Sequence, residues 1–344
     1  MVQSDEFDYL SVDAFIKDIV DARALATALE LRLIDYLVKN QPVALDELKK
    51  GFKGNAQGPP LLLDLLMANN VLEESKGEIR LTQPFEKALQ YRDLLEAKLE
   101  WASFVLTDFM DLFTTLIHSP DRLGGNARIS DFFCYHRSFE ASPENYEVTK
   151  RWMRITTAFT KYEAQVCMKY HDFGRYHRIL DIGGNSGEFI LRICRKYSSI
   201  QATVFDLPLV CDIGQEHILS EPEAERITFI KGNALTDALP EGFDLITFKS
   251  MLHDWPEKEA KQFIVKASES LKPGGTLLIF ERGPLEVREK TLPYSMIPFL
   301  LFFHSFRSPV IYEEHLRDLG FQEIAFEKIY LETPFHLVTA KKKI

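Results

Sequence analysis

Hydrophobic residues follow a helical spacing in the first half of the chain, and strands and helices alternate after about residue 178. In the first half, Leu25, Leu29, Leu33 and Leu37 recur every four residues, which predicts one apolar helical stripe. The same kind of pattern predicts further helices over residues 43–50, 61–70, 94–118 and 143–168.

The segments VLEES and EIRLT, joined by Lys76-Gly77, predict a β-hairpin after the first three helices. Three helices followed by a hairpin is a winged-helix pattern, which raises DNA binding as a hypothesis. Residues 1–100 contain 12 Lys and Arg against 18 Asp and Glu, and this acidic balance opposes contact with phosphates. We therefore expect this region to form a homodimer by burying its leucine stripe against a second copy.

The second half predicts an α/β fold, because regular alternation of strands and helices is typical of a mostly parallel sheet covered on both faces. We expect a Rossmann-like sheet of seven strands that ends in a hairpin. The strands are predicted at residues 178–183, 202–206, 226–230, 243–249, 276–281, 321–330 and 335–342, and the helices at 187–197, 209–219, 257–271, near 291–304 and near 310–319.

Length, charge and cysteine content limit the possible domain organisation and partners. The 344 residues suffice for a dimerisation domain over 1–100, a helical linker and substrate-pocket region over 101–170, and a catalytic domain over 171–344. The net charge of −10 argues against nucleic acid as a partner. Four scattered cysteines, an N-terminus without a secretion signal and the lack of an apolar run near 20 residues predict a reduced, cytoplasmic protein without a membrane segment.

The segment LDIGGNSG, residues 180–187, lies where the first strand of the alternating region turns into a helix. Glycines there allow a ligand to approach the backbone, and the helix offers unpaired amides. The dinucleotide fingerprint GxGxxG does not fit, because Ile182 stands where its first glycine is needed. Asp206 ends the second strand, where a carboxylate can accept hydrogen bonds from both hydroxyls of a ribose. We therefore predict a nucleoside site without a pyrophosphate site.

The motifs DIGGNSG, VFDLP, KGNAL, FKSMLHDWPE and LKPGGTLLIFE, in this order, resemble the class I S-adenosylmethionine-dependent methyltransferases. Within that class the chain is similar, over nearly its whole length, to the plant-type small-molecule O-methyltransferases, such as the caffeate and acetylserotonin enzymes. The resemblance implies S-adenosylmethionine as the cofactor, a small-molecule acceptor and a winged-helix-like dimerisation domain. Asn233 and Ala234 depart from the family's Asp-Met or Asp-Phe pair. The cofactor-binding residues that the resemblance implies are Asp181, Gly183, Gly184, Gly187, Asp206, Leu207, Asn233, Ala234 and Lys249.

The same resemblance makes His253 a general base that takes the proton from a substrate hydroxyl. Glu281 matches a glutamate that flanks this histidine, and Arg307 matches an arginine near the last helix. Phe306 stands where the family has a second glutamate, so the usual set is incomplete. Asp254 has two interpretations: a catalytic residue, or an N-cap of the helix that follows, with Pro256 in its first turn and Glu257 as the capping-box partner.

The acceptor is expected to be a small aromatic hydroxyl compound in an apolar cavity. Two alternatives remain. His253 and His304 are candidate ligands of a divalent metal that assists C-methylation of a 2-oxo acid, with Arg307 on the substrate carboxylate; otherwise His304 packs as an aromatic residue. The second alternative is a winged-helix regulator that senses S-adenosylmethionine. The predicted cavity residues are Phe104, Met153, Phe159, Phe299, Phe303 and His304.

Overall fold

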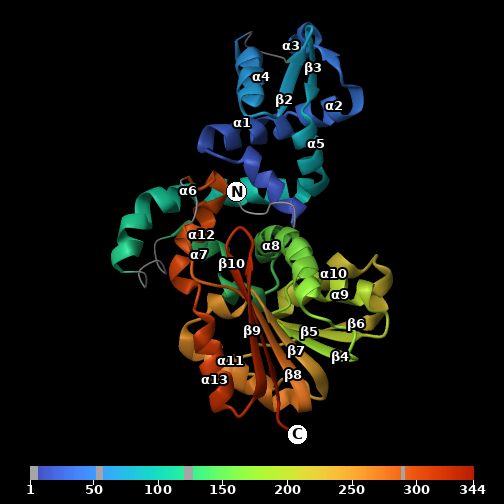
Figure 1. Cartoon of the computed structure of the whole chain (residues 1–344), viewed down its shortest axis with the longest axis vertical. Helices are drawn as coiled ribbons and strands as arrows, with labels where there is room; N and C mark the ends of the chain where they lie inside the picture. The colour runs from blue at the N-terminus through green and yellow to red at the C-terminus, as the bar shows by residue number, and fades with distance from the viewer. Residues whose placement is uncertain (1–6, 52–56, 120–126, 288–290) are drawn as a thin grey trace. The chain divides into compact units, whose positions relative to one another are not determined.

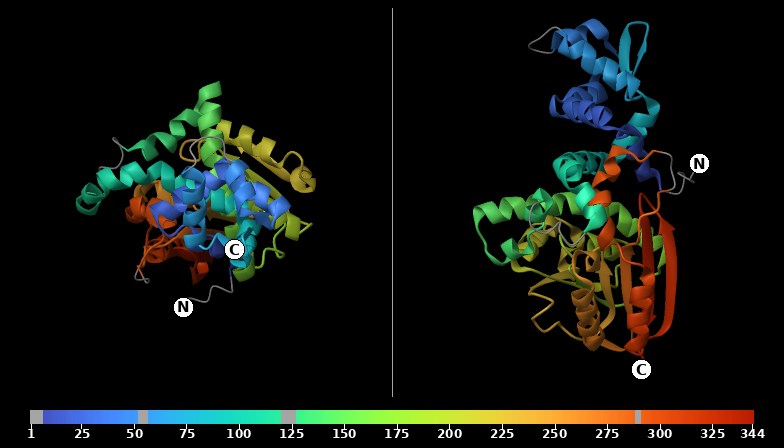
Figure 2. Two further views of the ribbon diagram at one scale, coloured as in Figure 1. Left: turned by 90° about the horizontal axis from the view of Figure 1, so that it is seen from above. Right: turned by 90° about the vertical axis from the view of Figure 1, so that its left-hand side faces the viewer.

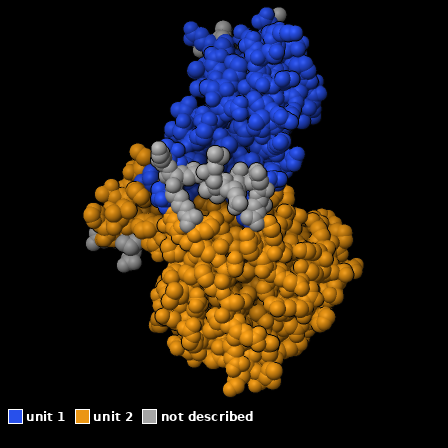
Figure 3. Space-filling view, viewed as in Figure 1, with its two compact units in different colours: residues 1–109, 287–298 blue, residues 110–286, 299–344 orange. Residues whose placement is uncertain are grey.

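The computed structural model describes residues 7–51, 57–119, 127–287 and 291–344. It divides into two compact units (Figure 3): Met1–Phe109 with Val287–Pro298, and Met110–Glu286 with Phe299–Ile344.

The first unit contains the predicted helices and hairpin. Strands β2 (Leu72–Ser75) and β3 (Glu78–Leu81) form the hairpin around Lys76-Gly77, which confirms that prediction. The short strand β1 (Val43–Ala44) pairs with β3, so the sheet has the order β1-β3-β2. The helical elements are η1 (Asp8–Phe15), α1 (Ile19–Glu30), α2 (Leu33–Asn40), α3 (Leu45–Gly51), α4 (Gly58–Ala68), α5 (Gln83–Ala88), η2 (Leu89–Tyr91) and α6 (Arg92–His118), whose last residues belong to the second unit.

The leucine stripe does not form one helix, contrary to the prediction. The chain breaks between α1 and α2, where Arg32 adopts a left-handed conformation with φ of 57°. Leu25, Leu33 and Leu37 are nevertheless buried within the chain. These three leucines are therefore not available to a second copy, which corrects the expectation that the stripe forms the dimer contact. A spacing of four residues predicts which positions are buried, but it cannot show that a single left-handed residue interrupts the helix between them.

The second unit is built on the predicted seven-stranded sheet, with the order β6-β5-β4-β7-β8-β10-β9. Pairing is parallel from β6 to β8, and β10 is antiparallel to both of its neighbours. The strands are β4 (Arg178–Ile182), β5 (Gln201–Asp206), β6 (Ile227–Lys231), β7 (Phe243–Lys249), β8 (Leu271–Arg282), β9 (Gln322–Tyr330) and β10 (Pro334–Lys341).

Helices cover both faces of this sheet (Figures 1 and 2). Helices α9 (Glu188–Lys196) and α10 (Pro208–Ile218) contact β5, and α8 (Pro143–Tyr170) contacts both of these helices. On the other face, α11 (Glu257–Ser270) contacts β8, and α13 (Pro309–Asp318) contacts β9 and β10. The shorter helical elements are α7 (Arg128–Phe132), η4 (Tyr135–Phe139), η5 (Pro222–Arg226), η6 (Leu252–Asp254), η7 (Tyr294–Met296), α12 (Ile297–Leu301) and η8 (Phe303–Ser305).

The fold brings the predicted site residues to one edge of the sheet. Asp181, Asp206, Lys249 and Glu281 lie at or next to the carboxyl ends of β4, β5, β7 and β8. Carboxyl ends of parallel strands share an edge, and ligands of open α/β sheets bind outside that edge. Among the described helices, none is long and apolar enough to cross a membrane.

Candidate active site

The glycine loop after β4 is held in a conformation that requires glycine. Gly183 has φ of 69°, and a Cβ atom there would lie 2.4 Å from Cγ of Met251. At Gly184 a Cβ atom would lie 2.7 Å from Oδ2 of Asp181. Gly187 is the N-cap residue of α9, so the loop leads directly to a helix N-terminus. A side chain at either glycine would therefore collide with Met251 or Asp181, so this loop conformation depends on glycine.

Asp206 ties the end of β5 to the same loop. Its Oδ2 atom accepts a hydrogen bond from the Asn185 amide at 2.8 Å, and Oδ1 accepts one from the Leu207 amide at 2.7 Å. Burial raises the pKa of Asp206 to about 6, although both amides favour its ionised form. Each carboxylate oxygen can accept a second hydrogen bond, so the side chain can still bind two hydroxyls.

Asp181 presents an unused acceptor beside the glycines. Its Oδ1 atom accepts a hydrogen bond from the Thr247 hydroxyl at 2.6 Å, whereas Oδ2 is buried without a hydrogen-bond partner in the described part of the chain. Burial raises the pKa of Asp181 to about 7. Because an unpaired buried polar atom is costly, Oδ2 is a candidate contact for a donor that a ligand brings.

Asn233 and Ala234 follow β6. The Asn233 side-chain oxygen accepts a hydrogen bond from the Leu235 backbone amide at 3.0 Å, and the Asn233 backbone amide donates to the Asp237 carboxylate at 2.8 Å. Ala234 is buried in the core cluster of the sheet. The contact of these two residues with a cofactor stays a prediction.

Lys249 has its counter-ion within the chain. Its ammonium group forms an ion pair with Glu163 of α8 and donates to the Thr160 hydroxyl at 2.8 Å. Glu163 also pairs with Arg282, which lies 3.3 Å from Glu332. The resemblance implies that Lys249 meets a cofactor carboxylate. This role stays a prediction, and Glu163 already compensates the buried charge.

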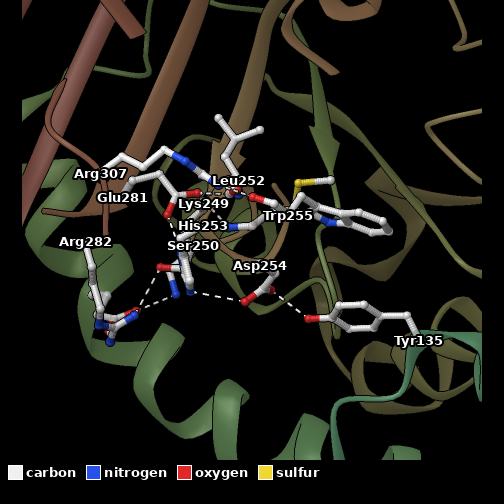
Figure 4. A network of polar contacts seen from close by, with 12 residues as sticks. Tyr135, Lys249, Ser250, Leu252, His253, Asp254, Trp255, Glu281, Arg282 and Arg307 are labelled. Atoms are coloured by element: carbon white, nitrogen blue, oxygen red, sulfur yellow. Dashed lines mark hydrogen bonds and ion pairs between the residues drawn. The ribbon is translucent and has the colours of Figure 1, made fainter. Parts of the chain in front are cut away.

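His253 and Glu281 form the centre of the polar network in Figure 4. The His253 Nδ1 atom lies 2.6 Å from Glu281 Oε2. Glu281 is itself fixed, because its Oε1 atom accepts hydrogen bonds from the Met251 and Leu252 amides, both at 2.7 Å. Burial lowers the pKa of His253, but the negative charges of Asp254 and Glu281 outweigh burial, so the pKa is raised overall. The contact with Glu281 places the proton of a neutral ring on Nδ1 and leaves the lone pair on Nε2.

Asp254 is not a helix cap, which corrects one of the two sequence interpretations. Helix α11 begins at Glu257 after Pro256, and no side chain caps it. The Asp254 carboxylate instead accepts a hydrogen bond from the Tyr135 hydroxyl at 2.7 Å, and its Oδ1 atom lies 3.4 Å from Nε2 of His253. Asp254 therefore belongs to the polar contacts around His253 and not to the N-terminus of α11.

Arg307 supports the turn that carries His253. Its guanidinium group donates to the Leu252 carbonyl oxygen at 2.8 Å and to the Trp255 carbonyl oxygen. Phe306, at the position of the missing glutamate, places its ring edge against the His253 ring with a centroid distance of 5.5 Å. This side of the imidazole is therefore apolar.

The predicted metal site is not assembled. His304 is exposed, and its ring lies edge-on to Phe303 at 5.7 Å. Across the described ranges, no group of three or more His, Cys, Asp or Glu side chains is placed to hold a metal ion. The residues present therefore do not fit the divalent metal of the C-methylation alternative.

Some of the side chains that were predicted to line an apolar cavity lie close together. Met153 and Phe159 of α8 and Phe299 of α12 are buried, and the rings of Phe159 and Phe299 meet edge-on at 6.2 Å. Phe303 is half-buried. Phe104 lies on α6 and belongs to the first unit, so its place in the cavity stays a prediction.

A separate hollow of about 650 Å³ lies at the opposite, amino-terminal edge of the sheet. Its lining includes Arg175, Asp244, Lys272 and Lys341, and none of the predicted site residues. Lys272 of this lining pairs with Asp244 at 2.9 Å.

Two residues of the site, Tyr135 and Glu163, were missed in the sequence analysis. A signal existed for Glu163, because it follows the buried Phe159 by four residues and thus places a charge on the apolar face of a helix. Tyr135 has no comparable signal, since it precedes α8 in a segment without periodicity.

Comparisons with known proteins identify the family of this chain. A family model for an O-methyltransferase domain matches residues 125–322, and one for an O-methyltransferase dimerisation domain matches residues 14–85. The chain is 28% identical over 268 residues to a probable bifunctional dTTP/UTP pyrophosphatase/methyltransferase protein of Homo sapiens, covering 76% of this chain and 42% of that protein. It is 31% identical over 160 residues to acetylserotonin O-methyltransferase of Gallus gallus, covering 44% of each.

These two matches thus span less than half the length of either relative. The solved structure of human N-acetylserotonin methyltransferase in complex with S-adenosylmethionine has a TM-score of 0.73 with this chain at 21% identity, covering 94% of each chain. That likeness shows a shared fold, and the first family model covers more than half of the chain. The chain therefore belongs to the O-methyltransferase family, the S-adenosylmethionine-dependent family that its motifs resemble.

Proposed function

We propose that this protein transfers a methyl group from S-adenosylmethionine to a hydroxyl of a small aromatic molecule, with His253 as the general base. The observation that carries the proposal is the 2.6 Å contact between His253 Nδ1 and the buried Glu281, which directs the Nε2 lone pair of His253 away from Glu281. A neutral imidazole held in this tautomer is suited to accept a proton near neutral pH.

The residues at the carboxyl edge fit the cofactor. Asp181 Oδ2 offers an unused acceptor for an ammonium group, and Asp206 offers acceptors for two ribose hydroxyls. When bound, S-adenosylmethionine supplies a methyl group that a positively charged sulfur activates. The glycines at 183 and 184 let the loop pass close to Met251 and Asp181, and the loop leads to the N-terminus of α9, where backbone amides can meet a ligand.

His253 supplies the proton transfer. The acceptor hydroxyl gives its proton to Nε2 of His253, and the electron pair left on its oxygen would form the new bond to the methyl carbon as the bond from that carbon to sulfur breaks and its electron pair stays on sulfur. The imidazolium ion that results lies between the carboxylates of Glu281 and Asp254, which stabilise its charge. Base catalysis of this kind contributes about 10²- to 10⁴-fold to the rate.

An aromatic acceptor fits the apolar side of the site. Phe159, Phe299 and Met153 are buried in the same unit, and Phe306 covers one side of the His253 ring. Relatives of this chain are acetylserotonin O-methyltransferases. We extend a small-molecule acceptor of this kind to the present chain.

We further propose a homodimer formed through the first unit. The matched dimerisation domain spans residues 14–85. Within that range Ile19, Val20, Leu31, Val38 and Leu61 are 50–60% exposed. Apolar side chains that gather on one domain are a typical surface for a second copy.

The test of the function is transfer of labelled methyl from S-adenosylmethionine to a pool of aromatic hydroxyl compounds and to a pool of 2-oxo acids, each with and without chelator. We expect label in the hydroxyl pool that chelator does not reduce. Chelator-sensitive label in the 2-oxo acid pool would support C-methylation instead. Tight binding of the cofactor and of duplex DNA, without transfer to either pool, would support the regulator.

The cofactor site is tested separately by Asp206→Asn. The variant loses one charged acceptor and presents an amide donor to a backbone N–H, so we expect the Kd for S-adenosylmethionine to rise about 10- to 100-fold. Isothermal titration calorimetry measures this change. Asp212→Asn is the matched control, because Asp212 on α10 forms a surface ion pair with Lys231 at 2.5 Å. Equal Kd values for both variants would contradict the assignment of Asp206.

A further inference from the structure

Tyr135 reaches the site from a segment outside the sheet. Its hydroxyl donates to Oδ2 of Asp254 at 2.7 Å, and its ring stacks on Trp255 with a centroid distance of 5.8 Å and an interplanar angle of 16° (Figure 4). The same ring meets Trp152 of α8 edge-on at 6.1 Å. Two tryptophans therefore fix the position from which the hydroxyl approaches Asp254.

One carboxylate is shared between Tyr135 and His253. While Oδ2 of Asp254 accepts from the tyrosine, Oδ1 lies 3.4 Å from His253 Nε2. This distance suits an ion pair but exceeds an ordinary N–H···O hydrogen bond. Asp254 therefore acts on Nε2 through its charge and leaves the lone pair accessible to an acceptor hydroxyl.

The groups around His253 show which charge acts on its Nε2 atom. Glu281 faces Nδ1 from β8, Arg282 of β8 opposes protonation of the ring, and Phe306 contributes no charge. Arg307 directs its guanidinium group at backbone carbonyls. Asp254 is thus the carboxylate next to the nitrogen that takes the proton.

We propose that Tyr135 is a positioning residue that acts through Asp254: its hydroxyl orients the Asp254 carboxylate and keeps it ionised, so that Asp254 stabilises the protonated form of His253. The catalytic consequence rests on the proposed function of His253. The link between Tyr135 and the proton affinity of His253 does not depend on it.

The physical reason is competition at Asp254. Burial raises the pKa of Asp254, whereas His253 and the hydrogen bond from Tyr135 lower it. Without the hydroxyl, the neutral carboxyl becomes more favourable, and His253 loses part of the negative charge that supports its protonation. The pKa of His253 then falls, and the ring becomes a weaker base.

The experiment is an NMR titration of histidine-labelled protein, in which the His253 signal is identified by its absence from His253→Gln. We expect the pKa of His253 to be lower in Tyr135→Phe, which keeps the ring between the tryptophans. Asp254→Asn should also lower it, and Tyr135→Phe should add nothing in that background. The matched control is Tyr36→Phe in the first unit, where the hydroxyl donates to Glu47 at the same distance of 2.7 Å. An unchanged titration in Tyr135→Phe, or an equal further effect in Asp254→Asn, would overturn the proposal.

A kinetic readout separates this proposal from the proposed function. In Tyr135→Phe the acidic limb of kcat/KM should move to lower pH, and kcat above that limb should fall about 3- to 10-fold. If the wild-type protein transfers methyl to no hydroxyl compound, the proposed function fails, while the NMR titration still decides the role of Tyr135. If the wild-type protein is active but neither the titration nor the pH profile moves in Tyr135→Phe, the role of Tyr135 alone fails.

Discussion

His253→Gln is expected to lower kcat for methyl transfer by about 10²- to 10⁴-fold. The glutamine amide can still donate a hydrogen bond to Glu281, but it cannot take a proton at neutral pH. Because the cofactor residues are unchanged, the Kd for S-adenosylmethionine should stay near the wild-type value. Labelled methyl transfer measures kcat, and calorimetry measures the Kd on the same preparation.

His315→Gln is the matched control for this variant. His315 lies on α13 in the same unit, and its Nε2 atom contacts the Lys261 carbonyl oxygen at 3.1 Å. We expect nearly wild-type transfer from it. If His253→Gln retains activity within a few-fold of this control, another group takes the proton and His253 is not the base.

The pH dependence of the wild-type enzyme follows from the same assignment. A general base must be neutral before the reaction, so kcat/KM should rise with pH and level off above the pKa of His253. The carboxylates of Asp254 and Glu281 raise this pKa above its ordinary 6.5 in spite of burial. The acidic limb should therefore have its midpoint above 6.5, and a profile that is flat through this region would contradict the assignment.

The sheet and the strand-end residues could be predicted from the sequence because they rest on order along the chain. Parallel strands deliver Asp181, Asp206, Lys249 and Glu281 to one edge wherever the intervening helices lie. The flanking of His253 by Glu281 was implied by the resemblance, and the rule adds only that Glu281 lies at this edge.

The partners of these residues could not be predicted in the same way. Glu163 and Tyr135 come from α8 and from the segment before it, and their positions depend on how helices pack on the sheet. For Asp254 the sequence predicted a local role that the structure does not show, because Pro256 and Glu257 form a pattern that is typical of a helix cap. Local pattern favoured the cap, and tertiary contacts with Tyr135 and His253 decided otherwise.

The charge network around Glu163 gives the largest expected effect on stability. The side chains of Glu163, Lys249 and Arg282 are only 1%, 8% and 8% exposed. Burial opposes ionisation of Glu163, but Arg282 and Lys249 together lower its pKa. Since the folded-state pKa lies below the ordinary 4.5, this stabilisation is present above that value and is lost as the pH falls through the folded-state pKa.

Glu163→Gln is expected to lower the free energy of unfolding by about 3–5 kcal/mol at neutral pH, because it leaves two buried cations with too little negative charge. Urea denaturation followed by circular dichroism measures the change. Glu147→Gln on the same helix is the control; Glu147 is exposed, so its replacement should stay within about 0.5 kcal/mol of wild type. The difference between the variants should shrink at acid pH, where Glu163 itself takes up a proton. Equal unfolding curves at neutral pH would mean that Lys249 and Arg282 find other counter-ions, and Glu163 would then have no special part in holding α8 against the strand ends.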